Sequence, residues 1–497
     1  MAFCLNFPLF LIVLSFICAA VSSVLSGRAA RACSLSLTAI SFAANTVLFR
    51  YAFAEASVFT YMMGHYPHPW GNELRIGPLE AFISLFFSLV LFLCLLGGKQ
   101  QLAGRIVPEK QHYFYVMTDL IQASLLALIY TNDLFSGYVF IEICTLSSCG
   151  ILMIRRTGHA ILASVRYMIF SLVGSGLFLL GVIILYSITG HLLMPNLRES
   201  IGLLWESGAY HLPLLSSICL ISIGLAVKSG LFPFHLWMAD TYGVAVPASS
   251  GILSGLISKV YIFFLLKLIY DVFGLTVFYD CGIHHLLYVM GAAGIITGSV
   301  SAMRENNIFR MIAFSSAAQI GYIYMGIGLR PEVGVLAALF QILAHAVTKP
   351  ALFLSAGQLS AAAGKAKRFH DLQGAAYENP AAGAAFTAAA FSMIGLPFTM
   401  GFMAKFLFGT AAFQASRARL ILTLLVLALS TILNTLYFAR TVLRLYNKPQ
   451  LEAYTPVCAG SQLSYVLAGS IFFAVNLLLG TLSQPLIELL TKGLQLL

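Results

Sequence analysis

The chain has 497 residues, of which 60% are hydrophobic and only 9% are charged, and its mean hydropathy is +0.90. Soluble globular domains do not have this composition, so the sequence indicates a membrane protein. The net charge of +10 comes from basic residues scattered among short polar segments, which argues against a nucleic-acid-binding surface and is typical of a topology signal.

Apolar runs of about 20 residues recur along the whole chain, as expected for membrane-spanning helices. The first run has no basic segment before it, so we interpret it as a retained span and not as a cleaved signal. Lysine and arginine are about twice as frequent in the connections on one side as on the other, which predicts that both termini face outward. We place the spans at about 5–25, 32–53, 78–97, 112–130, 134–153, 161–189, 212–230, 242–270, 284–303, 308–328, 333–360, 384–411, 418–444 and 463–490.

Charged residues interrupt several of these runs. In chain order they are Glu142, Lys228, Lys259, Lys349 and Lys405. A charge at the centre of a bilayer costs roughly 3 kcal/mol or more, so each needs a partner or a hydrated path. Burial and neighbouring charges change how tightly amines and carboxylates hold a proton, so such a row can act as a proton relay. The alternative for Glu142 and Lys228 is a static buried ion pair that fixes helix register.

Two of these lysines lie beside predicted helix breaks. Lys228 opens KSGLFPFHLW, whose glycine and proline should break the span, and Lys405 closes GLPFTMGFMAK. Irregular backbone at membrane depth is tolerated where it lines a hydrated cavity. The recurrence predicts two inverted five-helix repeats in an all-α polytopic fold of about fourteen transmembrane helices. The predicted divisions are 1–111 (helices 1–3), 112–270 (first repeat), 284–444 (second repeat) and 463–497 (helix 14).

The predicted link between the repeats is FQILAHAVTKPALFL, where His345 and Lys349 are four residues apart and share a helical face. A histidine can exchange protons near neutral pH, although a buried histidine can equally be structural. Lys259 would connect Lys228 with this helix, whereas we interpret Lys267 and Arg166 as side chains that snorkel from span ends.

Several further polar residues are candidate accessory sites. His235 is either a gate or a helix cap, and Asp133 and Asp240 are either entry or coupling sites or helix caps. The polar side chains of span 10 either carry water or pack between helices. The span 10 residues are Ser315, Ser316 and Gln319.

The motifs KSGLFPFHLW, AVPASSGILSGLISK, HAVTKPALFLSAG and GLPFTMGF together resemble the antiporter-like subunit family. This family includes the large subunits of Mrp-type cation/proton antiporters and the proton-pumping membrane subunits of respiratory complex I and membrane-bound hydrogenases. TYGVAVP and SGLISK resemble the Mrp D-type and the complex I N-type branches more than the L-type branch, and TNDLFSGYVFIEI is more similar to the Mrp D-type.

The resemblance covers about residues 60–445 and implies specific site residues. Gln341 stands where some members have a second histidine, which implies a shorter or water-mediated central relay. The relay positions matched to the family are Glu142, Lys228, Lys259, His345, Lys349 and Lys405.

Two functions therefore remain open. One is proton translocation in an Mrp-type sodium/proton antiporter, and the other is proton pumping in a redox-driven complex. We find no nucleotide-binding loop and no haem, flavin or metal signature, so we expect no cofactor and an energy source in an ion gradient or a partner. Whether the chain counts as an enzyme depends on that complex. We expect a multi-pass protein of the cell (inner) membrane with related antiporter-like and small multi-span subunits as partners, and protons, with sodium as a second candidate, as cargo.

Overall fold

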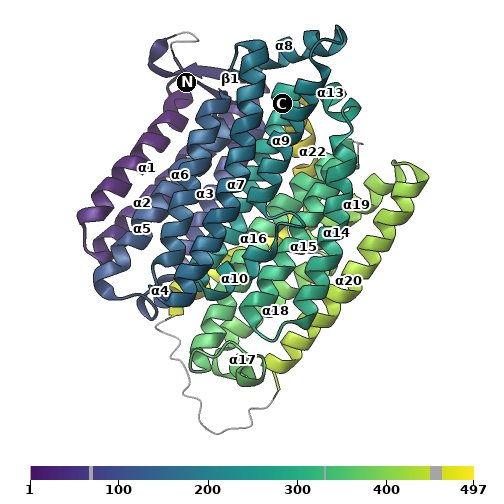
Figure 1. Ribbon diagram of the computed structural model, residues 1–497. Helices are drawn as coiled ribbons and strands as arrows, with labels where there is room; N and C mark the ends of the chain where they lie inside the picture. The colour runs from purple at the N-terminus through teal and green to yellow at the C-terminus, as the bar shows by residue number, and fades with distance from the viewer. Residues whose placement is uncertain (1, 67–70, 330–331, 448–461) are drawn as a thin grey trace.

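The computed structural model describes residues 2–66, 71–329, 332–447 and 462–497 as a bundle of long helices (Figure 1). Twelve of the described helices are long and apolar enough to cross a membrane. Helix α15 (Ile308–Gly328) and the shorter apolar helices α18 (Pro380–Ile394) and α19 (Met400–Phe413) accompany them, so the polytopic all-α fold is confirmed.

The N-terminal part consists of three long helices and a small hairpin. Strands β1 and β2 are antiparallel, with Phe59 opposite Ile76 and Met62 opposite Glu73. The elements are η1 (Ala2–Asn6), α1 (Phe7–Val24), α2 (Gly27–Glu55), β1 (Phe59–Met62), η2 (Met63–His65), β2 (Glu73–Ile76), α3 (Pro78–Gly97), α4 (Lys99–Ala103) and η3 (Pro108–Lys110).

The central part runs from Gln111 to Asp280 and is largely helical. Its last span is one continuous helix from Pro247 to Phe273 that contains two π-helical turns, η4 and η5. The elements are α5 (Gln111–Tyr130), α6 (Leu134–Met153), α7 (Gly158–Thr189), α8 (Met194–Glu206), α9 (His211–Ser229), α10 (Leu236–Val244), α11 (Pro247–Ile252), η4 (Leu253–Ile257), α12 (Ser258–Leu268), η5 (Ile269–Phe273) and α13 (Leu275–Asp280).

The C-terminal part differs from the prediction at its end. We expected one span over 463–490, but α21 ends at Thr481 and a separate helix, α22, follows after Leu482, which is non-helical. The elements are α14 (Ile283–Arg304), α15 (Ile308–Gly328), α16 (Glu332–Ala362), η6 (His370–Leu372), α17 (Ala375–Glu378), α18 (Pro380–Ile394), α19 (Met400–Phe413), α20 (Arg417–Leu445), α21 (Leu463–Thr481) and α22 (Ser483–Gln495).

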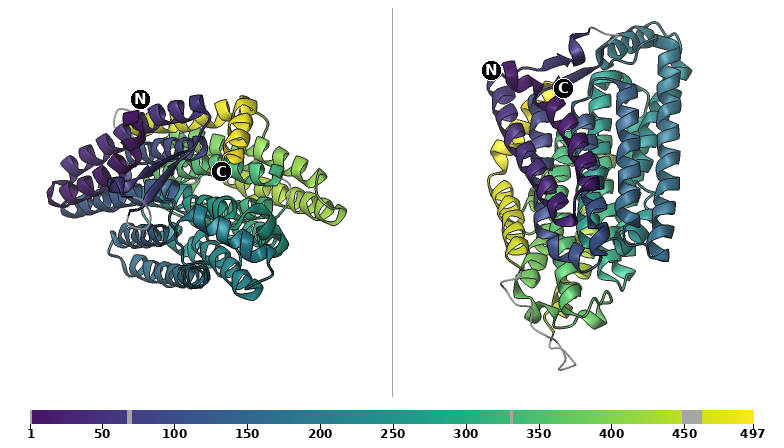
Figure 2. Two further views of the ribbon diagram at one scale, coloured as in Figure 1. Left: turned by 90° about the horizontal axis from the view of Figure 1, so that it is seen from above. Right: turned by 90° about the vertical axis from the view of Figure 1, so that its left-hand side faces the viewer.

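Both ends of the chain lie at the same end of the bundle, and α4 and α17 lie at the opposite end (Figure 1). Viewed along the bundle, the purple N-terminal helices form one edge and the yellow-green α20 forms another (Figure 2). The Pro247–Phe273 helix and α16 are almost entirely buried. The two central helices therefore carry Lys259, His345 and Lys349 where lipid does not reach them.

Helices α7 and α9 approach each other closely because glycines face one another. A Cβ atom added to Gly224 would lie 2.6 Å from the Gly174 carbonyl oxygen, and one added to Gly174 would lie 2.8 Å from Cγ of Lys228. Such distances leave no room for a side chain, so this glycine contact fixes the α7 backbone directly against the lysine.

Candidate functional site

The first predicted helix break is present. Helix α9 ends at Ser229, Gly230 adopts a positive φ of 82°, and helical structure resumes at Leu236 in α10. Glycine tolerates this left-handed conformation and is therefore favoured at the end of a helix. The Lys228 side chain thus emerges from the last turn of α9, directly before the irregular segment.

Lys228 lies beside Glu142 without a tight bond to it. Its Nζ atom is 3.6 Å from Oε1 of Glu142 but donates a 2.6 Å hydrogen bond to the Thr145 hydroxyl, one turn further along α6. The lysine side chain is 1% exposed and the glutamate side chain 21% exposed, and Glu142 Oε1 has no hydrogen-bond partner among the described residues. The hydroxyl contact gives the ammonium a partner that does not depend on the charge of Glu142.

Lys259 lies on the next helix toward the centre. The ring of Tyr261, two residues later, is 5.6 Å from the Lys228 ammonium, so Lys228 faces this helix. Lys259 itself donates a hydrogen bond back to the carbonyl of Ser254, inside the π-helical turn η4. π-Helical turns often mark functional sites, and this one supplies the carbonyl that solvates a fully buried amine.

His345 and Lys349 lie one turn apart on α16 and are both buried, as the spacing predicted. Lys349 donates to the Ile312 carbonyl at 3.1 Å and to the Ser315 hydroxyl. Neither ring nitrogen of His345 has a hydrogen-bond partner among the described residues. Lys259 and Lys349 both interact electrostatically with His345, so the three residues form one central cluster.

The second predicted break is also present. Helix α18 ends at Ile394, Gly395 has a φ of 92°, and α19 begins at Met400. The Lys405 ammonium reaches back across the break to the Ile394 carbonyl at 2.6 Å and to the Thr431 hydroxyl at 3.1 Å. Each broken helix therefore carries a lysine near its break, and the Lys405 ammonium bonds the backbone at the end of α18.

A small polar cavity joins the centre to the second break. His345 and Lys405 both line it, together with Gln319 and Gln341, whose side chains share a 2.5 Å hydrogen bond. Polar groups converge on this space from α15, α16, α18 and α19. The cavity is therefore the contact region between His345 and Lys405.

The remaining accessory residues divide into two groups. Ser315 contacts Lys349, and Ser316 lies 2.9 Å from the Ser254 hydroxyl, so span 10 contacts the central cluster. Asp133 accepts a hydrogen bond from the Ser136 backbone N–H and caps α6. His235 is buried at the start of α10, but its side chain makes no capping hydrogen bond.

Asp240 does not cap a helix. It lies within α10 and pairs with Arg166 at 2.5 Å and with Arg310 at 2.7 Å. Arg166 therefore lies in a cluster of charged side chains, with Glu305 at 2.9 Å from Arg310. Because the arginines come from α7 and α15, the sequence spacing gave no indication of this cluster.

The interpretation of Lys267 as a snorkelling side chain is wrong. Its side chain is fully buried and donates to the carbonyls of Ile129 and Thr131, with Glu80 at 3.9 Å. Arg75 pairs with the same Glu80 at 2.6 Å and with Asp271 at 3.0 Å. These residues form an end cluster near the two chain termini. Glu80 and Lys267 each interrupt an apolar run, the same signal that identified Glu142.

We expect Lys267→Met to destabilise the protein, because Glu80 and Asp271 would then share a single guanidinium. Removing one partner from a buried ion pair costs about 3–5 kcal/mol. The thermal unfolding temperature of the purified protein and its amount in membranes should both fall. Lys99→Met, at an exposed position, is the matched control. Equal unfolding temperatures for Lys267→Met and wild type would show that this cluster does not stabilise the fold.

The fold and these buried residues define a class: a many-span membrane protein with two broken helices and a row of lysines and a histidine between them. The sequence matches the family described as NADH:quinone oxidoreductase/Mrp antiporter, TM, over residues 131–431, and the chain belongs to this family.

Two relatives and one solved structure show the range of this similarity. The N subunit of NADH-quinone oxidoreductase from Desulforudis audaxviator is 33% identical over 409 residues, covering 81% of this chain and 79% of the relative. The D subunit of the Na(+)/H(+) antiporter from Alkalihalophilus pseudofirmus is 28% identical over 352 residues, covering 71% and 69%. A chain of the Mrp complex from a Dietzia species has a TM-score of 0.86 at 22% identity, with 99% of this chain and 97% of that chain covered.

Proposed function

We propose that this chain is a proton-translocating membrane subunit of an Mrp-type sodium/proton antiporter. The observation that carries the proposal is the row of buried groups that starts at the Glu142–Lys228 pair, passes the central cluster of Lys259, His345 and Lys349, and reaches Lys405 through the polar cavity. Similarity to the D subunits of antiporters favours exchange of sodium for protons.

In this mechanism a proton moves by changes in charge pairing. When Lys228 is charged, the nearby ammonium favours ionised Glu142, and loss of the lysine proton releases that preference. The Thr145 hydroxyl holds the lysine side chain in place meanwhile. Lys259, His345 and Lys349 then exchange protons by the same coupling, and the cavity between His345 and Lys405 completes the path.

A second candidate is a proton-pumping subunit of a redox-driven complex. The 33% identity to an N subunit of NADH-quinone oxidoreductase favours it. Both functions use the same row of buried groups, so the partners and the energy source distinguish them. For either function we propose other membrane subunits as partners, a location in the cell membrane, and lipid around the exposed helix faces.

We propose that both chain ends face outward. Basic side chains gather at the opposite end of the bundle, where Arg155 and Lys367 bond the last carbonyls of α10. Burial, Arg155 and Arg105 lower the pKa of Lys367 to about 8, which reflects how closely these positive charges are placed. Excess lysine and arginine marks the cytoplasmic side of membrane proteins.

Purification of the intact assembly tests the antiporter proposal. We expect it to contain only multi-span membrane subunits, and we expect a sodium pulse to change the internal pH of everted vesicles without any electron donor. Co-purification of iron–sulfur or nickel–iron subunits, together with a pH change that needs NADH, ferredoxin or hydrogen, would replace this proposal with the redox-driven one.

A further inference from the structure

A second set of buried polar residues lies in the N-terminal helices, outside the row described above. On α2, Ser34, Thr38, Ser41 and Asn45 are spaced four, three and four residues apart and are all buried. This spacing places them on one helical face. That face meets α5 and α3, since Gln122 donates a 2.5 Å hydrogen bond to Ser41 and Asn45 bonds α3. A polar column thus runs inside an otherwise apolar helix bundle.

In the half of this column nearer the chain ends, the side chains form hydrogen bonds with one another. The Asn45 side chain accepts hydrogen bonds from Ser84 and Tyr130, both at 3.0 Å, and donates one to Ser88 at 3.2 Å. Interhelical hydrogen bonds of this kind hold membrane helices together. Helix packing therefore accounts for this half of the column without any ligand.

The other half has oxygen atoms without partners. Oδ1 of Asp119 and Oε1 of Gln122 are buried, and neither accepts a well-aligned hydrogen bond from the described residues. Asp119 and Gln122 lie one turn apart on α5, and Ser34 lies against the Asp119 carboxyl group from α2. Ser22 of α1 donates to Oδ2 of Asp119 at 3.1 Å. Three helices therefore bring oxygen atoms to one point.

Asp119 also differs from Glu80, Asp271 and Glu142 in its charge environment. Glu80, Asp271 and Glu142 each have a cationic nitrogen within 3.6 Å. Asp119 has no such ion pair among the described residues, although its side chain is completely buried. A carboxylate buried in this way needs a proton or a bound cation.

We infer that Asp119, Ser22, Ser34 and Gln122 form a binding site for a monovalent cation of the sodium class. These four side chains offer carboxylate, hydroxyl and amide oxygens, which are the ligands that hard cations prefer. One carboxylate neutralises one positive charge, so a monovalent ion suits the site better than a divalent one. The choice of sodium among monovalent ions rests on the proposed function.

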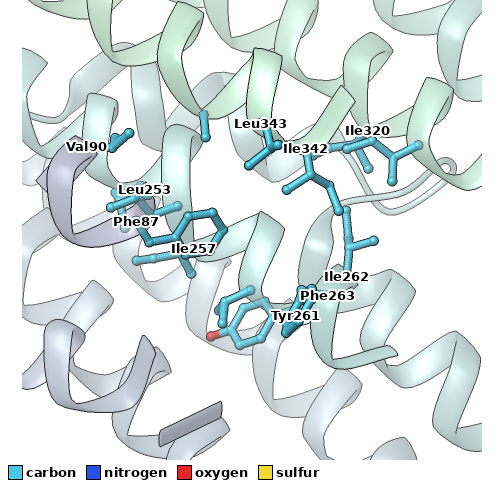
Figure 3. Close-up of a cluster of buried hydrophobic side chains, with 14 of the residues drawn as sticks. Phe87, Val90, Leu253, Ile257, Tyr261, Ile262, Phe263, Ile320, Ile342 and Leu343 are labelled. Carbon is cyan, nitrogen blue, oxygen red and sulfur yellow. The ribbon is translucent and has the colours of Figure 1, made fainter. Parts of the chain in front are cut away.

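The site is chemically separate from the lysine row. Ammonium groups repel sodium, so the row from Lys228 to Lys405 is a poor place for a metal cation. Helix α3 contacts both α5 and η4, and its apolar Phe87 and Val90 lie beside Leu253 and Ile257 of η4 (Figure 3). In this arrangement protons and sodium would occupy different parts of the same subunit.

Equilibrium binding of ²²Na⁺ to the purified assembly in potassium buffer tests the site. Asp119→Asn keeps the size of the side chain and removes its charge, so we expect sodium binding attributable to this subunit to weaken at least about tenfold. Ser34→Ala should weaken it severalfold with little structural disturbance. Ser88→Ala removes a buried hydroxyl from the half nearer the chain ends and should bind sodium as wild type does.

Wild-type sodium binding in both Asp119→Asn and Ser34→Ala would overturn the inference, as would a wild-type assembly that binds no sodium. If Asp119→Asn fails to assemble, the sodium affinity of the Ser34→Ala assembly decides whether the site exists. The measurement detects binding and not transport. Unchanged proton flux after substitution of Lys228 would therefore refute the proposed function and leave this result standing.

Discussion

Lys228→Met is expected to lower sodium-dependent proton flux in everted vesicles at least about tenfold, because a positioned proton donor typically contributes two to four orders of magnitude to a transfer step. Methionine fills much of the same volume beside Gly174, so the α7–α9 contact should survive. The variant loses the ammonium that pairs with Glu142 at 3.6 Å and with Thr145 at 2.6 Å. Its amount in membranes should be compared with wild type to separate transport from assembly.

Lys228→Arg separates a switching pair from a static one. Arginine keeps a positive charge beside Glu142, but its guanidinium does not release a proton in proteins. A static ion pair that only fixes helix register would therefore tolerate arginine. A proton relay would not, so we expect Lys228→Arg to assemble and to transport as poorly as Lys228→Met. Wild-type flux in an assembled Lys228→Arg variant would refute the relay through this residue.

The sequence predicts these positions well because each depends on local information. Glycine and proline after Lys228 and before Lys405 are enough to predict an interrupted helix, since they act on their own turn of backbone. A charged residue within an apolar run is also a signal that can be read from the neighbouring residues alone. For the same reason the predicted spans agree with the helices in most places. The interruption at Leu482 lies between Gly480 and Pro485, so the prediction of one continuous span over 463–490 overlooked a local signal.

The sequence does not show which residue on a neighbouring helix a buried side chain contacts. The spacing of Ser34, Thr38, Ser41 and Asn45 defines a polar face, but the bond from Gln122 to Ser41 joins residues 81 positions apart. Lys267 and Glu80 are separated even further. Hydrophobic packing orients such faces in three dimensions, so a buried charge at a span end cannot be told from a snorkelling one by sequence alone.

His345→Gln is expected to lower flux at least about tenfold as well, since glutamine retains hydrogen-bonding capacity but cannot carry a proton. A purely structural histidine would have its ring nitrogens bonded, yet neither has a partner among the described residues. The ring lines the same cavity as Lys405 and lies one turn from Lys349. Among the described residues no other imidazole lines that cavity, so His345 is the group there that can take up and release a proton near neutral pH.

His370→Gln provides the matched control, because His370 is exposed and pairs with Asp371 at 3.3 Å. Proton flux and sodium binding should be measured on the same preparations. Loss of flux with normal ²²Na⁺ binding in His345→Gln would place this histidine in the proton path and apart from the Asp119 site. Wild-type flux in His345→Gln would show instead that water connects Lys349 with Lys405 directly, since the cavity would then conduct without the imidazole that lines it.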